Sequence, residues 1–160
     1  TRTFSTTGVT PPVTDQKQKQ KARGTARLTP VVLEVAVGVE DAEQLIFSVD
    51  RSQLRPELAG QYALHDPAYS DANPGEVEYS AFSWTPAGRQ ARVFTNRAPS
   101  TTPTTGFLLV SRYDVERNLI SGSYYTGFSF VPDPRVLTPA NTPLWQIELE
   151  GQFHNLPLTQ

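Results

Sequence analysis

The clearest pattern of the chain lies near its C-terminal end, between residues 145 and 153. The odd positions there carry Trp, Ile, Leu, Gly and Phe, and the even positions carry Gln, Glu, Glu and Gln. Successive side chains of a β-strand point to opposite faces, so this strict period of two predicts a strand with one buried and one solvated face. Within it, Gly151 predicts a point of close packing or a bulge.

The same alternation recurs along most of the chain after residue 30. Three hairpins are predicted, which join residues 31–39 to 45–49, 77–84 to 89–96, and 107–113 to 119–130. Asp41 suits the tight turn of the first hairpin, and the sequence Thr-Pro-Ala-Gly suits the turn of the second. In the second strand of the third hairpin, residues 119–130, one face is predicted to hold Ile120, Gly122, Tyr124, Thr126, Phe128 and Phe130.

Stretches rich in turn-forming residues separate these strands. Pro56 and Gly60 interrupt the period between the first two hairpins, residues 65–75 are dense in Asp, Asn and Pro, and residues 131–143 contain four prolines. No stretch shows a convincing helical period. Seven or eight antiparallel strands around one core therefore predict an all-β fold, an antiparallel β-sandwich or a flattened barrel.

Residues 1–30 differ from the rest of the chain, because they are rich in Thr, Pro, Gln and Lys. Their net charge is +5, whereas residues 31–160 have a net charge of -7. This composition predicts an extended basic arm, residues 1–30, in front of a β-sandwich domain, residues 31–160. Because the arm complements the acidic body, Lys17, Lys19, Lys21 and Arg23 are candidate assembly residues.

The chain contains no cysteine and no methionine. Disulfides, thiol nucleophiles and cysteine-ligated metals are therefore excluded. The lack of an initiator methionine predicts a processed, exported protein at the cell surface, outside the cell or in the periplasm, and the alternative is a tag-trimmed cytoplasmic domain. The net charge of -2 gives no overall attraction to nucleic acid, and no apolar run approaches the roughly 20 residues of a membrane-spanning helix.

Three segments together resemble a known family. The sequences NLISGSYYTGF at residues 118–128 and IELEGQFHNLP at residues 147–157 are similar to the C-terminal strands of small uncharacterised lipoproteins of Bacteroidetes, which carry an "ISGTFSF" strand followed by V-x-G-x-F-x-N-(I/V/L). LAGQYAL at residues 58–64 is similar to their "aGtYtL" segment. The resemblance spans residues 30–158, although only about 25 positions carry it. It implies an exported, envelope-associated β-sandwich and no particular activity. Two features depart from the family, since this chain has no lipobox cysteine and its basic arm does not match the usual N-terminal strand.

Few residues suggest catalysis. His65 and His154 are the two histidines, and a histidine-based relay needs convergent partners that the sequence does not indicate. Glu148 and Glu150 lie on one face of the last strand, which raises the idea of paired acid and base carboxylates. Because the two glutamates alternate with core residues, they are better explained as solvated acidic side chains that the basic arm can contact. We therefore expect no enzyme activity and no cofactor.

A cluster of oxygen-bearing side chains gives a weak calcium candidate, formed by Asp66, Asp71, Asn73 and Glu76, with Glu78 nearby. Calcium accepts such ligands, but the spacing matches no defined calcium loop. The favoured interpretation is a set of Asx turns beside a solvated strand, with no metal bound.

Aromatic residues form the second candidate site, for binding a ligand. Phe82 and Trp84 face opposite to Val77, Tyr79 and Ala81 in their strand, so one of these sets is exposed or is covered by a loop or by the arm. Exposed aromatic side chains on a sheet commonly mark contacts with sugars or proteins. The candidate binding residues are Phe82, Trp84, Tyr69 and Tyr125.

Two functions follow from these patterns. The first is a non-enzymatic structural or self-assembling subunit of the envelope, whose arm adds a strand to its own body or to a neighbouring subunit. The alternative is a surface module that binds a glycan or another envelope protein through the exposed aromatic residues. The position of the arm distinguishes the two.

Overall fold

The computed structural model describes residues 2–5, 22–69, 71–134 and 144–160. This part of the chain is all-β, as predicted, and contains no α-helix and a single turn of 3-10 helix, η1. The elements in chain order are β1 (Arg2–Ser5), β2 (Arg23–Leu28), β3 (Val32–Val39), β4 (Glu43–Asp50), η1 (Arg51–Gln53), β5 (Gly60–Ala63), β6 (Gly75–Thr85), β7 (Gly88–Thr95), β8 (Thr104–Asp114), β9 (Leu119–Val131) and β10 (Trp145–Thr159).

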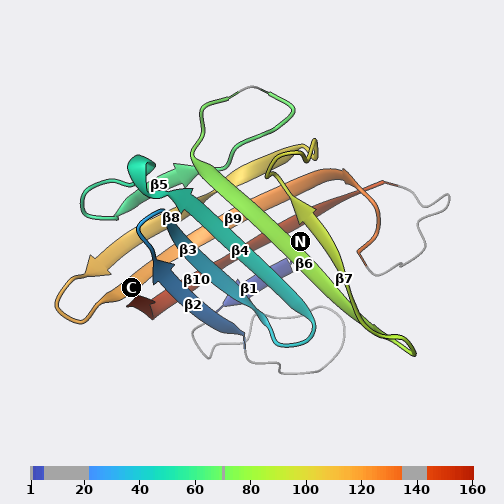
Figure 1. Cartoon of the computed structure of the whole chain (residues 1–160), viewed down its shortest axis with the longest axis horizontal. Coiled ribbons are helices and arrows are strands. Elements are labelled where there is room, and N and C mark those ends of the chain that lie inside the picture. The colour runs from blue at the N-terminus through green and yellow to red at the C-terminus, as the bar shows by residue number, and fades with distance from the viewer. Residues whose placement is uncertain (1, 6–21, 70, 135–143) are drawn as a thin grey trace.

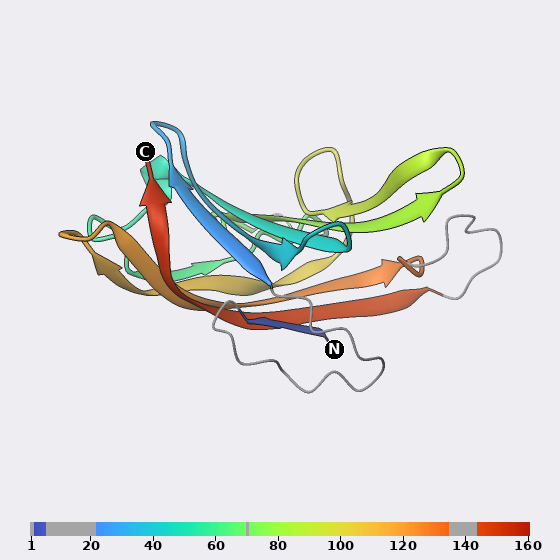
Figure 2. The same cartoon turned by 90° about the horizontal axis from the view of Figure 1, so that it is seen from below.

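The strands form two layers that share β10 (Figures 1 and 2). The hydrogen-bonded order is β5-β8-β9-β10-β2-β3-β4-β6-β7, and β1 pairs with β10 outside this path. The first layer holds β5, β8, β9 and most of β10, and the second holds β2, β3, β4, β6 and β7. At its C-terminal end β10 curves from the first layer to the second, where Leu158 and Thr159 pair with β2 (Figure 2). The prediction of a sandwich or flattened barrel is thus confirmed.

A second seam joins the layers between β5 and β6. Leu64 forms an isolated bridge with Gly75, and the His65 amide donates to the Gly75 carbonyl at 2.7 Å. The buried Asn96 fastens this seam, because its side-chain amide donates to the carbonyls of His65 (2.7 Å) and Gly75 (3.1 Å). Its Oδ1 atom accepts from the Val77 amide at 2.7 Å. Buried polar groups with several partners fix a unique geometry, so Asn96 holds the two layers together on this side.

The alternation of β10 confirms the strand predicted from the sequence and extends it. Ile147, Leu149 and Phe153 are buried, and they face the core between the layers. A register shift against β9 then lies between Phe153 and Leu156, and Asn155 within it has a φ of 51°. The buried positions change from odd to even there, so Leu156 and Leu158 point into the core from the curved end.

Aromatic rings hold the two layers together. Phe47 of β4 lies 5.2 Å from Tyr124 of β9, measured between ring centroids. Phe128 of β9 contacts both Tyr79 of β6 and Phe94 of β7, each at 6.4 Å. Rings at such distances add a directional attraction to the burial of their apolar surface. The core is therefore centred where β9 crosses the second layer.

Two residues differ from the sequence predictions near the ends of β9 and β10. Phe130 does not share the face of Phe128: its φ is 58° and its side chain is 73% exposed, while Val131 is buried instead. Trp145, predicted to be buried, is 52% exposed, because a register shift separates it from Ile147. Of the two alternatives predicted for Gly151, a bulge is excluded, because Gly151 pairs in regular register with Tyr124. Irregular backbone near the strand ends resets the alternation, which a strict period cannot anticipate.

The predicted boundary at residue 30 is too late. β2 pairs with β3 along its whole length, and its side chains Ala26 and Leu28 are buried in the core. β2 is short and contains Arg23 and Arg27. Its basic composition therefore led the sequence prediction to include it in the arm. The three predicted hairpins are present, as β3–β4, β6–β7 and β8–β9.

We predict that Phe128→Ala lowers the free energy of unfolding by about 3–5 kcal/mol, because it leaves a cavity between the layers. The matched control is Phe130→Ala on the same strand, which we expect to change it by less than about 0.5 kcal/mol, since an exposed side chain loses little contact. Chemical denaturation measures both values. Equal costs for the two variants would contradict the assigned orientation of β9.

Candidate functional site

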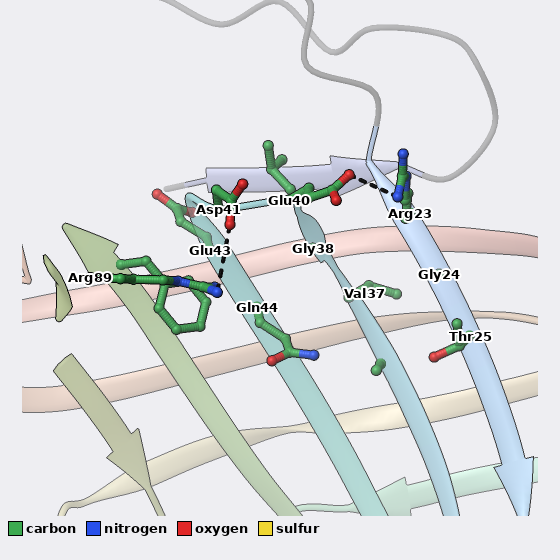
Figure 3. Close-up of a pocket in the computed structure, with 13 residues that line it drawn as sticks. Arg23, Gly24, Thr25, Val37, Gly38, Glu40, Asp41, Glu43, Gln44 and Arg89 are labelled. Carbon is green, nitrogen blue, oxygen red and sulfur yellow. Dashed lines mark ion pairs between the residues drawn. The ribbon is translucent and has the colours of Figure 1, made fainter. Parts of the chain in front are cut away.

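A shallow hollow lies on the outer face of the second layer, across β2, β3, β4 and β6 (Figure 3). Its volume is about 410 Å³. The floor is low because the outward side chains of the central strands are short, namely Thr25 of β2 and Ala36 and Gly38 of β3. A Cβ atom at Gly38 would lie 2.3 Å from the Glu43 carbonyl oxygen of β4, so this position accepts glycine alone. Close pairing of β3 with β4 thus creates the hollow. We call it the outer trough.

Two ion pairs form the rim of the outer trough (Figure 3). Arg23, at the start of β2, lies 2.7 Å from Glu40, and Arg89, near the start of β7, lies 3.5 Å from Asp41. Both carboxylates come from the turn between β3 and β4, where Asp41 adopts a φ of 63°. Turn geometry therefore places two acidic side chains between two strands that each supply an arginine. All four side chains remain substantially exposed, so the pairs contribute little to stability.

Aromatic side chains lie at one end of the outer trough. Phe82 lines it, and the Arg89 guanidinium carbon lies 3.7 Å from the centre of the Phe82 ring. Trp84 is the cross-strand partner of Arg89, and its side chain is 68% exposed. Val93, half-exposed on β7, extends the apolar surface on this outer face. The Phe82 ring and the Asp41 carboxylate hold the Arg89 guanidinium at this end of the trough, on the strand beside Trp84.

The four predicted binding aromatics are not all brought together. Phe82 and Trp84 share the outer face of β6, whereas Tyr69 is exposed in the loop after β5. Tyr125 is half-buried on β9, where its hydroxyl donates to Glu148 at 3.4 Å. Burial raises the pKa of Tyr125, and the negative charges of Glu148 and Glu150 add to the effect. Glu148 also accepts a hydrogen bond from Gln146 at 3.0 Å. This pair of glutamates is thus part of a solvated face of the first layer.

The weak calcium candidates are divided between two places: Asp66, Asp71 and Asn73 lie in the loop after β5, and Glu76 lies on β6. Asp66 is buried and accepts from the amides of Ala68 (3.0 Å) and Thr104 (3.3 Å), which ties the loop to β8. Glu76 instead pairs with Arg97 at 2.9 Å. Among the residues that the structure describes, no three His, Asp or Glu side chains are grouped closely enough to hold a metal ion.

Asp71 is the acceptor that organises the same loop. Its carboxylate lies 2.7 Å from the His65 Nδ1 atom and accepts from the amides of Asp66 (3.1 Å) and Asn73 (3.2 Å). Burial raises the pKa of Asp71, but these hydrogen bonds and the charge of His65 outweigh it, so that the pKa lies below its ordinary value of 3.8. Within the described loops, no hydroxyl group is hydrogen-bonded to the His65 ring. His154 lies on the exposed face of β10, where its Nε2 atom is 3.4 Å from the Gln152 Oε1 atom.

The structure describes only one of the four predicted assembly residues. Lys17, Lys19 and Lys21 lie outside the described residues, and Arg23 belongs to β2 and to the rim of the outer trough. The sequence predictions missed Glu40, Asp41, Gln44 and Arg89 as lining residues. Two signals were present, namely the short outward residues of β3 and the arginine that follows the turn at Gly88. Neither indicates which strands become neighbours.

Comparisons with known proteins find no relative of this chain, because no family model, curated protein or solved structure matches it. The function must therefore be inferred from the geometry of the chain.

We predict that Asp71→Asn lowers the free energy of unfolding by about 1 kcal/mol at pH 6, because the variant loses charge-assisted hydrogen bonds. A lowered pKa stabilises the folded state above pH 3.8, and this contribution disappears as the pH falls through the folded-state value. The difference from the wild type should therefore shrink below pH 3.8 in denaturation curves. In a His65→Gln background the same substitution should cost less. A difference that is independent of pH would show that the charge of Asp71 is irrelevant to the loop.

Proposed function

We propose that this protein is a non-enzymatic, exported β-sandwich subunit that assembles by adding its N-terminal strand to the edge of β10, in its own body or in a neighbouring copy. The observation that carries the proposal is the pairing of β1 with β10. Residues Arg2, Thr3, Phe4 and Ser5 pair in parallel with residues 149–152. The envelope location and the likeness to Bacteroidetes lipoproteins are parts of this proposal.

The edge of β10 explains why a strand is added there. β9 covers one edge of β10 along almost its whole length, whereas β2 covers the opposite edge only at Leu158 and Thr159. In the described residues, β1 is the only other strand on that second edge. Backbone amides and carbonyls along an open edge are ready to pair with another strand, and strand addition satisfies them.

The connection between β1 and β2 permits exchange between copies. Residues 6–22 separate the two strands, and a chain of that length can span at most about 60 Å when fully extended. That reach exceeds the width of several paired strands, which are spaced by roughly 4.8 Å. An exchanged strand would make the same contacts in trans as in cis, so the balance depends on protein concentration and linker strain.

Charge supports the same arrangement. With the boundary that the structure gives, residues 1–21 carry four basic and one acidic side chain, a net charge of +3. Residues 22–160 carry ten basic and fifteen acidic side chains, a net charge of -5. Glu150 of β10 is the register partner of Thr3, so one acidic residue of the body lies within the segment that β1 pairs with. Opposite net charges favour encounter between the arm and either body.

Association is the test of this function. We predict that the intact chain forms oligomers as its concentration rises, and that the double substitution Thr3→Pro with Ser5→Pro suppresses them, since proline has no amide hydrogen to donate to a ladder. Light scattering after size-exclusion chromatography measures the mass. The matched control, Thr10→Pro, places a proline outside β1 and should leave the mass unchanged.

Hydrogen exchange reports the docking of β1 independently of mass. The amides of residues 149–152 should exchange faster in the double proline variant than in the wild type, while those of β9 keep their protection. A chain that stays monomeric at every concentration, or oligomers that the prolines do not affect, would refute assembly by strand addition. No helix of the described residues is long and apolar enough to cross a membrane.

A further inference from the structure

We infer that the outer trough binds a neutral oligosaccharide, with Trp84 as the stacking surface at one end. This site is separate from the acceptor edge of β10 and does not depend on the assembly proposed above. The trough is lined by strand residues and one tight turn, which are rigid supports for a ligand. Its inner surface consists of short side chains, and polar groups surround it.

The charges at the site select against anions. Arg23 and Arg89 line the trough with the carboxylates of Glu40 and Asp41, and each arginine has one of them as its partner. The opposite charges at the rim therefore balance. A phosphate, a sulfated glycan or a nucleic acid would have to compete with these carboxylates for the arginines, so a ligand without charge is favoured.

The rim groups match the hydroxyl groups of a sugar. A guanidinium presents five N–H donors in a plane, and a carboxylate has about four acceptor sites, so an ion pair with one contact leaves further donors and acceptors open to a ligand. Gln44 adds an amide that can both donate and accept. Vicinal hydroxyl groups need such alternating partners at close spacing, whereas an apolar ligand would leave them unsatisfied.

Trp84 supplies the apolar part of the site. Its side chain is 68% exposed beside Arg89, and it has no role in the core. The C–H faces of a pyranose ring are apolar and carry partial positive charge, which suits the negative face of an indole. An exposed tryptophan on a rigid strand next to hydrogen-bonding groups is therefore suited to stack a sugar.

An extended peptide fits this site less well. Peptides commonly bind sheets by main-chain hydrogen bonds at an open edge. The floor strands β3 and β4 are each paired on both sides, so they offer side chains alone. From β2 to β7 the site spans four strand intervals, or about 19 Å, which suits an extended saccharide lying across the strands.

Titration of the intact chain with cellohexaose, xylohexaose, mannohexaose and maltohexaose, followed by calorimetry and backbone NMR shifts, tests the inference. We expect saturable binding of at least one hexaose, with shifts confined to the residues of the trough and Trp84. Ala36→Arg should fill the floor and Trp84→Ala should remove the stacking surface, each weakening binding by about tenfold or more.

Matched variants separate this effect from loss of fold. Ala36→Ser keeps the floor low, and Tyr69→Ala removes an equally exposed aromatic residue elsewhere, so both should bind as the wild type does. The variant with Thr3→Pro and Ser5→Pro should also bind normally, whether or not it assembles. Saturable binding of none of the four hexaoses, equal binding by Ala36→Arg, or a preference for chondroitin sulfate or for a basic peptide would overturn the inference.

Discussion

The shared strand β10 is the constraint on which the rest of the structure depends. Its first part is hydrogen-bonded to β9, and its last residues pair with β2 in the other layer. A strand can serve both layers only if its buried side changes where it curves, and the shift around Asn155 provides this change. Because the chain closes through β10 and through the seam at Gly75, the two layers enclose one aromatic core.

The curvature of β10 also leaves its second edge uncovered along most of its length. β2 reaches that edge only where β10 enters the second layer, so the exposed backbone groups before this point need another partner. β1 supplies one for residues 149–152. The geometry that closes the core thus creates the acceptor for an arm, and strand addition becomes a consequence of the architecture rather than of a dedicated binding pocket.

The outer trough arises from a different requirement. Close approach of β3 and β4 excludes a side chain at Gly38, and the neighbouring outward residue is Ala36, so the sheet surface is low there. The turn that joins these strands projects Glu40 and Asp41 beside the hollow, where Glu40 pairs with Arg23 of β2 and Asp41 pairs with Arg89 of β7. A hollow with a polar rim and an exposed tryptophan beside it has the features of a site that can recognise a ligand.

The sequence by itself determined the all-β class, the three hairpins and the buried face of β10, because alternation of apolar and polar residues is a local property that each strand expresses on its own. It also identified Phe82 and Trp84 as aromatic residues on one face of their strand. Only the tertiary structure decided the rest. Strand order brought Arg23, Arg89 and the turn after β3 together from distant positions, and composition placed β2 in the arm although pairing with β3 and β10 makes it part of the body. Phe130 and Trp145 follow the alternation in sequence yet point to solvent, because irregular backbone and register shifts depend on how neighbouring strands pair.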